Sequence, residues 1–600
     1  MRAFAELSEN GKRMDVRFAP FNVVVKDGVK AIPGARFVSV EKGGPYWSVP
    51  LDLRAAKQLR EVFGQTLTLG AALKAWGHAE VEKFKKLGAI VLVDDVPLEE
   101  LKLYGKLPKL AEWLRPYQRA DVSFMGTTSA LNLNEPRLGK TTETIAAVYE
   151  GDLELGPQLV IAPQKALDSV WRMEIERWTP GYIATHSGLV KADFDEFYYE
   201  VDSMERPAWW VTTAEMIRRG NYPTDIEWNT FTIDEYHKTG LLRAVGTNDA
   251  KKNSKFVMAV RNITSERRYV LSGTPIGGRA IKLWSGLNFI APETFGAKWR
   301  WATDWLEVSE DDDGHKMVGS DLREETKEEF DKYHAPYIVR RLREEVLPQL
   351  PPKLAIPVWC EMEKAQRKQY ESFAADLEVR IEDHRVAANN VLAEYTRLKQ
   401  FSNALCTVEV IGTKDNGDPL LKVIPTETSG KLPYLLDRLA EDGIDPEDQA
   451  GTTQAIVASQ FKEYIKMVSS YLTSKGISNI LLTGGTSKRD SDLAQRAFKA
   501  GNDNEGLRVC CMVTTMGVGI TLDNVTAVHL MDETWVPDDQ DQLSDRAVNT
   551  TRNHQVSVFT YRSLLGIEEE IYKENASKAW TNRDVLDARR RGFRATRKGQ

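Results

Sequence analysis

Short apolar runs alternate with helical patterns along two separate stretches of the chain. In the first stretch, about residues 110–292, the runs are 159–162, 209–212, 231–233 and 269–271. In the second stretch they are 455–458, 480–482, 509–513, 527–531 and 556–561. Runs that are apolar throughout are typical of strands buried on both faces, and intervening helices favour parallel pairing. The pattern predicts two α/β domains, each built on a parallel sheet.

The segments around these stretches have other patterns. Residues 1–105 contain strand-like pieces at 21–25, 37–40 and 47–49 and then helical patterns, which indicates a small α+β domain. A charged, mostly helical region follows the first stretch, and a loop rich in Gly, Asp and Asn lies near 412–419. Residues 588–600 are basic and contain no acid. We expect an N-terminal domain at 1–105, a first lobe at 106–295, helical insertions and a linker at 296–425, a second lobe at 426–575 and a basic tail at 576–600.

The composition is that of a globular protein, with 42% hydrophobic and 28% charged residues. No apolar run approaches the ~18 residues of a membrane span, and residues 1–9 lack an apolar signal core. We therefore expect no membrane partner and a cytoplasmic protein, or a nuclear one in a eukaryote. The short inserts and the lack of extra regulatory domains favour a bacterial or phage source. The four cysteines have no metal-ligand spacing, and Cys510 and Cys511 are expected to be buried strand residues. Because the net charge is −7, a nucleic acid must be held by local basic surface and backbone groups.

Residues 134–141, Asn-Glu-Pro-Arg-Leu-Gly-Lys-Thr, form a candidate phosphate-binding loop between an apolar stretch and a helical pattern. A loop that opens a helix directs backbone N–H groups and the helix dipole at an anion. Lys140 supplies a charge between the β- and γ-phosphates, and Thr141 offers a hydroxyl to Mg²⁺. Asn134 replaces the usual first glycine and tolerates strained backbone geometry. By itself Gly-Lys-Thr occurs often by chance, so an ordinary turn stays an alternative here.

A pair of carboxylates at the end of the strand at 231–233 supports the first interpretation. Asp234 is placed to hold Mg²⁺, and Glu235 is placed to orient and activate a water molecule. A solvated acidic strand end would explain neither the buried strand nor the upstream Gly-Lys-Thr. Residues 271–275, Leu-Ser-Gly-Thr-Pro, follow another strand, and their hydroxyls can couple the hydrolysis site to a second surface. Alone, this last segment is also compatible with a simple turn.

The order and spacing of these motifs resemble the Swi/Snf-type ATPases of helicase superfamily two, over about residues 112–575. The matching segments are 114–118, 134–141, 159–163 with the tryptophans at 171 and 178, 234–237, 283–292, 338–341, 350–353, 458–461, 514–522 and 542–546. The chain departs from the family at Asn134, Pro136 and Arg137. It also departs in the last motif, where Asn549 stands at the position of the second arginine. The next arginine is Arg552, which a three-residue insertion would make the second arginine finger, although it would not share the helical face.

The resemblance implies an α/β fold of two RecA-like parallel-sheet lobes, with helical insertions between them and a small α+β N-terminal domain. ATP and Mg²⁺ are the implied cofactors, bound in the cleft between the lobes. The implied nucleotide-binding residues are Gln118 as the adenine reader, Asn134, Gly139, Lys140, Thr141, Thr142, Gly517 and Gly519. The implied metal ligands are Thr141 and Asp234. The implied catalytic residues are Asp234, Glu235 and the arginine fingers Arg546 and Arg552, which can contribute ~10³–10⁵ in rate.

The resemblance also implies a monomer that acts on double-stranded or forked DNA, with replication or repair proteins as further partners. Phosphates would be held without sequence readout by Thr212, Thr213, Ser459, Gln460, Thr514 and Thr515. Residues 29–36 and 47–51 resemble the HARP domain that accompanies annealing helicases. In that case Lys26, Lys30, Arg36 and Lys42 would meet phosphates, and Trp47 would stack on a base. The alternative is an unrelated α+β module with Trp47 in its core.

Three hypotheses follow for the function. The first is an ATP-dependent translocase on duplex DNA that remodels or anneals forks and recombination intermediates in replication or repair. The second is a motor that displaces proteins or RNA polymerase from DNA. The third is a catalytically weak DNA-binding scaffold, which the departures in the phosphate loop and in the last motif motivate.

Overall fold

The chain forms two compact units in a computed structural model. One unit contains Met1–Asn134, Gly139–Arg340 and Thr581–Gln600, and the other contains Glu135–Leu138 and Arg341–Trp580. The structure describes residues 2–11, 13–32, 34–39, 44–88, 92–188, 190–243, 254–274, 276, 279–310, 316–349, 353–382, 388–413, 419–445, 447, 452–499, 506–514, 522, 524–535, 540, 543–545 and 555–586.

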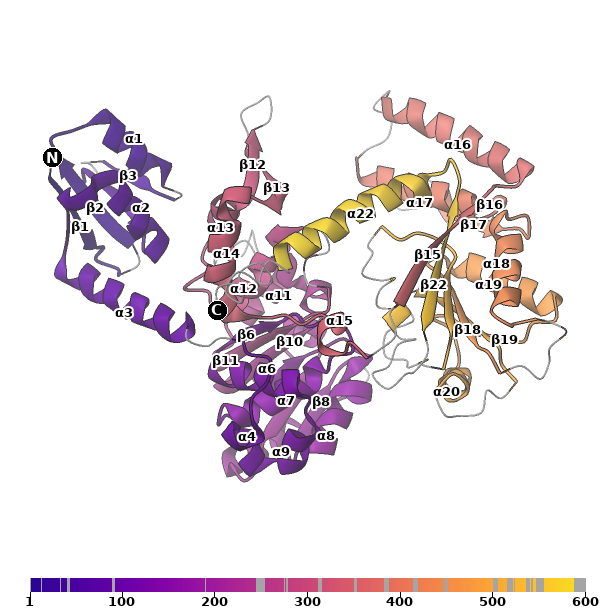
Figure 1. Cartoon of the computed structure of the whole chain (residues 1–600), viewed down its shortest axis with the longest axis horizontal. Helices are drawn as coiled ribbons and strands as arrows, with labels where there is room; N and C mark the ends of the chain where they lie inside the picture. Colours follow the sequence, from indigo (N-terminus) through magenta and orange to yellow (C-terminus); the bar gives the residue numbers. More distant parts are fainter. Residues whose placement is uncertain are drawn as a thin grey trace. The chain divides into compact units, whose positions relative to one another are not determined.

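The N-terminal domain is a five-stranded sheet in the order β3-β4-β2-β1-β5, with helices on one face (Figure 1). Its strands are β1 (Arg2–Leu7), β2 (Arg13–Ala19), β3 (Arg36–Val38), β4 (Tyr46–Pro50) and β5 (Leu67–Leu69), and its helices are α1 (Val23–Ala31), α2 (Leu53–Phe63) and α3 (Ala71–Gly88). Alternate residues such as Met14 and Val16 of β2 face the helices and are buried with Leu59 and Trp47. The polar residues between them face away from the helices, because successive strand residues alternate sides.

The strand predicted at residues 21–25 is wrong, since α1 begins there. Asn22 is extended, and its side-chain oxygen accepts a hydrogen bond from the Val25 N–H at 3.1 Å. A helix cap of this kind contributes about 1 kcal/mol. Capping and burial of Val29 therefore outweigh the β preference of the three adjacent valines.

The first lobe is built on a seven-stranded parallel sheet in the order β14-β6-β11-β10-β7-β9-β8. Its strands are β6 (Ala130–Asn132), β7 (Pro157–Ile161), β8 (Tyr182–His186), β9 (Ala208–Thr212), β10 (Trp228–Asp234), β11 (Ser265–Leu271) and β14 (Ile338–Val339). Its helices are α4 (Lys102–Lys106), α5 (Pro108–Trp113), α6 (Pro116–Thr127), α7 (Lys140–Glu150), α8 (Met173–Trp178), α9 (Phe194–Ser203), α10 (Ala214–Arg219), α11 (Lys255–Arg261) and α12 (Leu283–Ile290). Leu159 packs in one core and Val160 in the other, so the sheet is buried on both faces, as predicted.

The second lobe is built on a six-stranded parallel sheet in the order β15-β22-β21-β18-β20-β19. Its strands are β15 (Lys353–Cys360), β18 (Ala455–Ser459), β19 (Asn479–Leu482), β20 (Val509–Val513), β21 (Ala527–Leu530) and β22 (Val556–Ser563). Its helices include α18 (Lys431–Glu441), α19 (Lys462–Ser474), α20 (Lys488–Ala497) and α22 (Ile567–Leu586). Cys510 and Cys511 are buried in cores on opposite faces of the sheet, as predicted.

The region between the lobes is less helical than predicted. It contains α13 (Lys298–Trp305), α14 (Lys327–His334), α15 (Arg343–Val346), α16 (Lys364–Glu382) and α17 (Ala388–Asn403), and also the hairpins β12 (Leu306–Glu310)–β13 (Lys316–Leu322) and β16 (Cys406–Thr413)–β17 (Pro419–Pro425). Two of its strands, β14 and β15, are edge strands of the two lobe sheets. Strand β15 was not predicted because it contains Pro357, and proline is disfavoured in a central strand. It is tolerated here because β15 lies at the edge of its sheet.

Among the described residues, no helix is both long and apolar enough to span a membrane.

Candidate functional site

The phosphate-loop candidate ends at Gly139, which caps the first turn of α7. Gly139 has φ +91°, in the left-handed region that favours glycine. A Cβ at this position would overlap the side-chain amide nitrogen of Gln118 from α6. The loop therefore brings its glycine against the predicted adenine reader, and α7 opens directly at Lys140.

Lys140 is a partly buried residue of the first unit. Its Nζ donates a hydrogen bond to the Asn134 carbonyl oxygen at 2.8 Å. Burial lowers the pKa of Lys140, while the charges of Glu235 and Asp234 oppose that shift. A cation beside two acids and a helix N-terminus suits a triphosphate with its bound magnesium ion.

The two predicted catalytic acids lie where β10 ends. Burial and the Glu235 charge raise the pKa of Asp234 to about 7, and the Trp171 indole N–H donates to Asp234 Oδ2 at 3.0 Å. Glu235 follows with φ +47°, a left-handed conformation that costs a non-glycine residue about 1–3 kcal/mol. Its Oε2 lies 3.3 Å from His237 Nδ1. A divalent cation here would favour the ionised Asp234, and the half-buried Thr141 would offer it a second oxygen ligand.

Trp171 holds the predicted metal ligand, and its role can be tested. The indole lies on a π-helical turn, Leu167–Arg172, of the kind that often occurs at functional sites. We expect Trp171→Phe to keep the ring packing but to lose the hydrogen bond to Asp234. The Mg²⁺ concentration needed for half-maximal ATP hydrolysis should then rise about 10–100-fold. Titration of ATPase rate with Mg²⁺ measures the effect. Trp178→Phe is the control, because the Trp178 indole donates to Glu174 at 2.9 Å instead; equal shifts in both variants would contradict the role.

The carboxyl ends of β10 and β11 are joined by a hydrogen bond. His237 Nδ1 lies 2.9 Å from the Ser272 hydroxyl, which also accepts the Thr274 N–H at 3.1 Å. Ser272 and Thr274 belong to the segment predicted to couple the hydrolysis site to a second surface. This hydrogen bond joins the acidic motif directly to the segment that follows β11, as the predicted coupling requires.

The structure explains why an asparagine stands at position 134. Its side-chain amide donates to Asp121 at 2.8 Å and to Glu143 at 3.1 Å, and Asn132 donates to Glu143 at 2.7 Å. Burial and the Asp121 charge raise the pKa of Glu143 to about 8. An aspartate at position 134 would add a third carboxylate to this buried group. The side chain of Asn134 is therefore directed at the acids beneath the loop, and its backbone carbonyl contacts Lys140.

Two other predicted nucleotide ligands have partners within the protein. The Thr142 hydroxyl donates to Glu174 at 2.9 Å and is buried. Gln118 Oε1 accepts the Arg115 N–H at 3.0 Å, which fixes the side chain at the start of α6. Thr142 is thus placed to stabilise α7, whereas Gln118 stays beside the loop through its amide nitrogen.

The last motif is described only up to Asp545. In the second unit the Asp545 carboxylate lies 3.1 Å from Arg343 and 3.5 Å from Lys353. Burial opposes ionisation, but these two cations lower the pKa of Asp545. Arg343 was missed from the sequence, because its contact with Asp545 depends on the fold. The predicted residues Arg546, Arg552, Gly517, Gly519 and Thr515 lie outside the described residues.

The predicted DNA-binding hydroxyls are mostly engaged inside the lobes. Thr212 is buried and donates to the His186 carbonyl oxygen at 2.7 Å. Ser459 is buried and donates to Asp532. These two side chains are not available to a phosphate in this structure, because each hydroxyl already donates its hydrogen bond to a buried acceptor within the lobe.

The other DNA-binding candidates are also largely enclosed. Thr213 accepts the Met216 N–H at 3.4 Å as the cap of α10, and Gln460 donates to Asp532 at 2.8 Å. Thr514 is buried at the end of β20. Contact of these three residues with DNA stays a prediction.

The N-terminal candidates divide in the same way. Trp47 is only 9% exposed, packs in the core and contacts Phe37, so it does not stack on a base in this structure. That outcome agrees with the alternative of a core tryptophan. Arg36 is exposed, and Lys42 lies outside the described residues.

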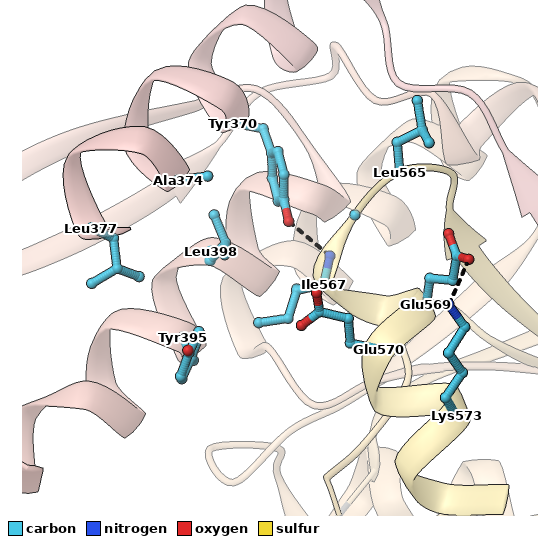
Figure 2. Close-up of a pocket in the computed structure, with 11 residues that line it drawn as sticks. Tyr370, Ala374, Leu377, Tyr395, Leu398, Leu565, Ile567, Glu569, Glu570 and Lys573 are labelled. Carbon is cyan, nitrogen blue, oxygen red and sulfur yellow. Dashed lines mark hydrogen bonds and ion pairs between the residues drawn. The ribbon is translucent and has the colours of Figure 1, made fainter. Parts of the chain in front are cut away.

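An apolar cavity of about 630 Å³ in the second unit lies apart from these residues (Figure 2). It lies between α16, α17 and the start of α22, where the Tyr370 hydroxyl accepts the Ile567 N–H at 2.7 Å. Lys573 is the one cation among its lining residues, and it pairs with Glu569 at 3.1 Å. The lining does not suit a triphosphate.

The first lobe therefore carries a glycine-ended loop that opens a helix, together with a lysine at the helix start and two acids at the end of a parallel strand. This combination defines a nucleoside-triphosphate-binding domain of the helicase type. Comparison with protein families gives the same class: residues 117–407 match the SNF2-related domain, and residues 431–550 match the helicase conserved C-terminal domain. The chain belongs to the Swi/Snf-type ATPases of helicase superfamily two.

Relatives and solved structures give the extent of the similarity. The chain is 25% identical over 482 residues to the probable chromatin-remodeling complex ATPase chain of Oryza sativa subsp. japonica, covering 78% of this chain and 40% of that protein. It is 25% identical to the ISWI chromatin-remodeling complex ATPase ISW2 of Saccharomyces cerevisiae, covering 81% and 41%. The Sulfolobus solfataricus SWI2/SNF2 ATPase core in complex with dsDNA is 22% identical, with coverage of 79% and 92% and a TM-score of 0.34. The chain thus spans about two-fifths of the length of these two curated relatives.

Proposed function

We propose that the protein is an ATP-driven translocase on double-stranded DNA. The observation that carries the proposal is the grouping of Lys140, Asp234 and Glu235 in one site at the end of β10, beside the loop that opens α7. In the proposed reaction Lys140 neutralises the triphosphate, and Glu235 takes a proton from the attacking water. A magnesium ion held by Thr141 and Asp234 would supply charge neutralisation at the phosphates.

The DNA substrate is inferred from two kinds of support. The relatives named above are chromatin-remodelling ATPases, and the family resemblance extends through both lobes. The net charge of −7 excludes bulk attraction, so local groups must hold the phosphates. Contacts of that kind position a duplex without reading its sequence, which suits a motor that moves along DNA.

The finer proposal is that the substrate is a fork or recombination intermediate in replication or repair. It rests on the separate N-terminal sheet domain, whose segments 29–36 and 47–51 resemble the HARP domain of annealing helicases. A motor that removes proteins or RNA polymerase from DNA is the second candidate. The two differ in whether a branched structure is preferred over a plain duplex.

ATPase rates with matched single-stranded, duplex and forked DNA test both levels of the proposal. We expect duplex to stimulate hydrolysis over the rate without DNA, and a fork of equal length to stimulate it further. Lys140→Ala should abolish hydrolysis under every condition, since the cation proposed to neutralise the triphosphate is lost. Equal stimulation by duplex and fork would favour the protein-displacing motor. Rates no higher than those of Lys140→Ala, with or without DNA, would instead support the catalytically weak scaffold.

A further inference from the structure

The N-terminal domain is docked on the helical insertion of the first unit. Asp52 pairs with Arg300 of α13, and the Arg54 guanidinium lies 3.7 Å from the Asp304 carboxylate. Arg54 also lies over the Trp305 ring, 4.1 Å from its centre. These charge pairs and the cation–π contact hold the N-terminal domain against α13.

A cavity of about 280 Å³ follows this seam. The sheet side contributes Arg13, Arg36 and Pro50, and the insertion side contributes Phe295, Arg300 and Tyr333. The cavity is separate from the ATP site, since none of its lining residues belongs to the phosphate loop or to the acidic motif. Its size is near the lower end of the range for small-ligand sites.

The positive charges around the cavity fall into two pairs. Arg54 and Arg300 are matched by carboxylates, which are Asp52, Asp304 and Glu329. Among the residues that the structure describes, no carboxylate oxygen lies within 4.0 Å of the guanidinium of Arg13 or Arg36. The second pair therefore gives the cavity a positive charge without a matched acid.

Arg13 and Arg36 share one face of the sheet. Arg36 of β3 is in register with Ser48 of β4, and Ser48 is in register with Asp15, two residues from Arg13 on β2. Arg13 is fixed in place: its Nε donates to the Ser48 hydroxyl at 2.7 Å and an Nη donates to the Gly34 carbonyl oxygen at 2.7 Å.

Besides Asp52 and Asp304, which also line the cavity, two more acids lie near the same space. Glu293 is exposed and lines the cavity, and Asp15 is the neighbour of Arg13 on β2. Burial lowers the pKa of Arg13, and the charges of Arg36 and Arg300 lower it further, whereas Asp15 raises it. The like charges thus add to the effect of burial on Arg13, and an anion bound between the arginines would relieve their repulsion.

We propose that this seam cavity, lined by Arg13, Arg36, Phe295, Arg300 and Tyr333, binds a phosphate group. Guanidinium groups offer planar pairs of N–H donors that match phosphate oxygens, and one of the two is already held by backbone and hydroxyl acceptors. A phosphate here would connect the N-terminal sheet to the insertion, so its binding would strengthen the docking of the domain. The phosphate comes from the end of a DNA strand or from free phosphate, and these sources are separated by experiment.

Binding is measured on the full chain without ATP, so that failure of this site and failure of the motor are separate results. The probes are dye-labelled single-stranded oligonucleotides with a 5′-phosphate or a 5′-hydroxyl, followed by fluorescence anisotropy, and inorganic phosphate as competitor. We expect the oligonucleotide with a 5′-phosphate to bind more tightly than the one with a 5′-hydroxyl. In Arg36→Ala the affinity for the 5′-phosphate oligonucleotide should fall about tenfold. If the two ends bind alike while inorganic phosphate raises the Tm of the unchanged protein but not of Arg36→Ala, the site takes free phosphate.

Two further variants keep the proposal falsifiable. Arg17→Ala lies on the same sheet face but outside the cavity, pairs with Glu6, and should leave the phosphate effect intact. Glu293→Gln removes the acid at the rim and should strengthen phosphate binding about two- to fivefold. Arg36 is exposed, so its removal should not unfold the domain. Unchanged binding in Arg36→Ala, or an equal loss in Arg17→Ala, would overturn the proposal.

Discussion

The Glu235→Gln protein is expected to bind ATP as the unchanged protein does and to hydrolyse it about 10²–10⁴-fold more slowly. The amide has the size of the carboxylate but cannot take a proton from water. Its position is also constrained, because Glu235 is held in a left-handed backbone conformation at the end of β10. A substitution that keeps size and geometry therefore isolates the proton transfer from the binding of nucleotide.

Single-turnover hydrolysis and nucleotide affinity, measured on the same preparations, check this expectation. Lys140→Ala should lose affinity as well as hydrolysis, since the proposed role of its ammonium group is to neutralise the phosphates. Glu266→Gln is the matched control, because Glu266 is exposed on the neighbouring strand β11 and should leave both quantities unchanged. Hydrolysis by Glu235→Gln at the unchanged rate would assign the proton transfer to another group.

Lys431→Met is expected to cost the second unit about 3–5 kcal/mol of stability. The ammonium group of Lys431 is 1% exposed and donates to both oxygens of Glu568 at 2.8 and 2.7 Å, to Asn403 Oδ1 at 2.7 Å and to the Met531 carbonyl oxygen at 2.8 Å. Methionine fills the space but leaves the Glu568 carboxylate buried without its cation. Glu568 also accepts the Ser563 N–H at 2.9 Å, and Met531 directly follows β21, so loss of the ammonium group disturbs contacts at the ends of both β21 and β22.

Amide hydrogen exchange of β21 and β22 measures the loss within this unit, without requiring a single transition for the whole chain. Lys466→Met is the control, since its pair with Glu463 is 42% and 35% exposed and contributes at most about 1 kcal/mol. The double variant Lys431→Met/Glu568→Leu should recover much of the lost protection, because no buried charge is then left alone. Similar small losses in Lys431→Met and Lys466→Met would show that the buried pair contributes no more than a surface pair.

The two lobes could be predicted because their strands are buried on both faces. Runs such as 509–513 are apolar without interruption and have no other common explanation in a protein of this composition. The hairpin of β1 and β2 was not predicted, although Arg13–Ala19 alternates polar and apolar residues as a strand with one buried face does. In β15 the proline concealed a strand that only its edge position permits.

The site was predictable to the extent that its chemistry is local in the sequence. Gly139, Lys140 and Thr141 are adjacent, and Asp234 and Glu235 follow one strand. The bond from Trp171 to Asp234 joins residues 63 positions apart, and the burial of the Thr212 and Ser459 hydroxyls depends on neighbouring strands. Sequence spacing carries no information about such contacts, which explains why the supporting residues were missed.

The placement of the cysteines has a practical consequence for spectroscopy. All four thiols are buried, and the adjacent Cys510 and Cys511 lie in cores on opposite faces of the sheet. Burial raises the pKa of Cys360, Cys406 and Cys510 to about 12, so reactive thiolate is scarce at neutral pH. A cysteine introduced on the surface of each lobe could therefore carry a fluorophore while the native thiols stay in place, and the distance between the labels would report whether the two lobes move during turnover.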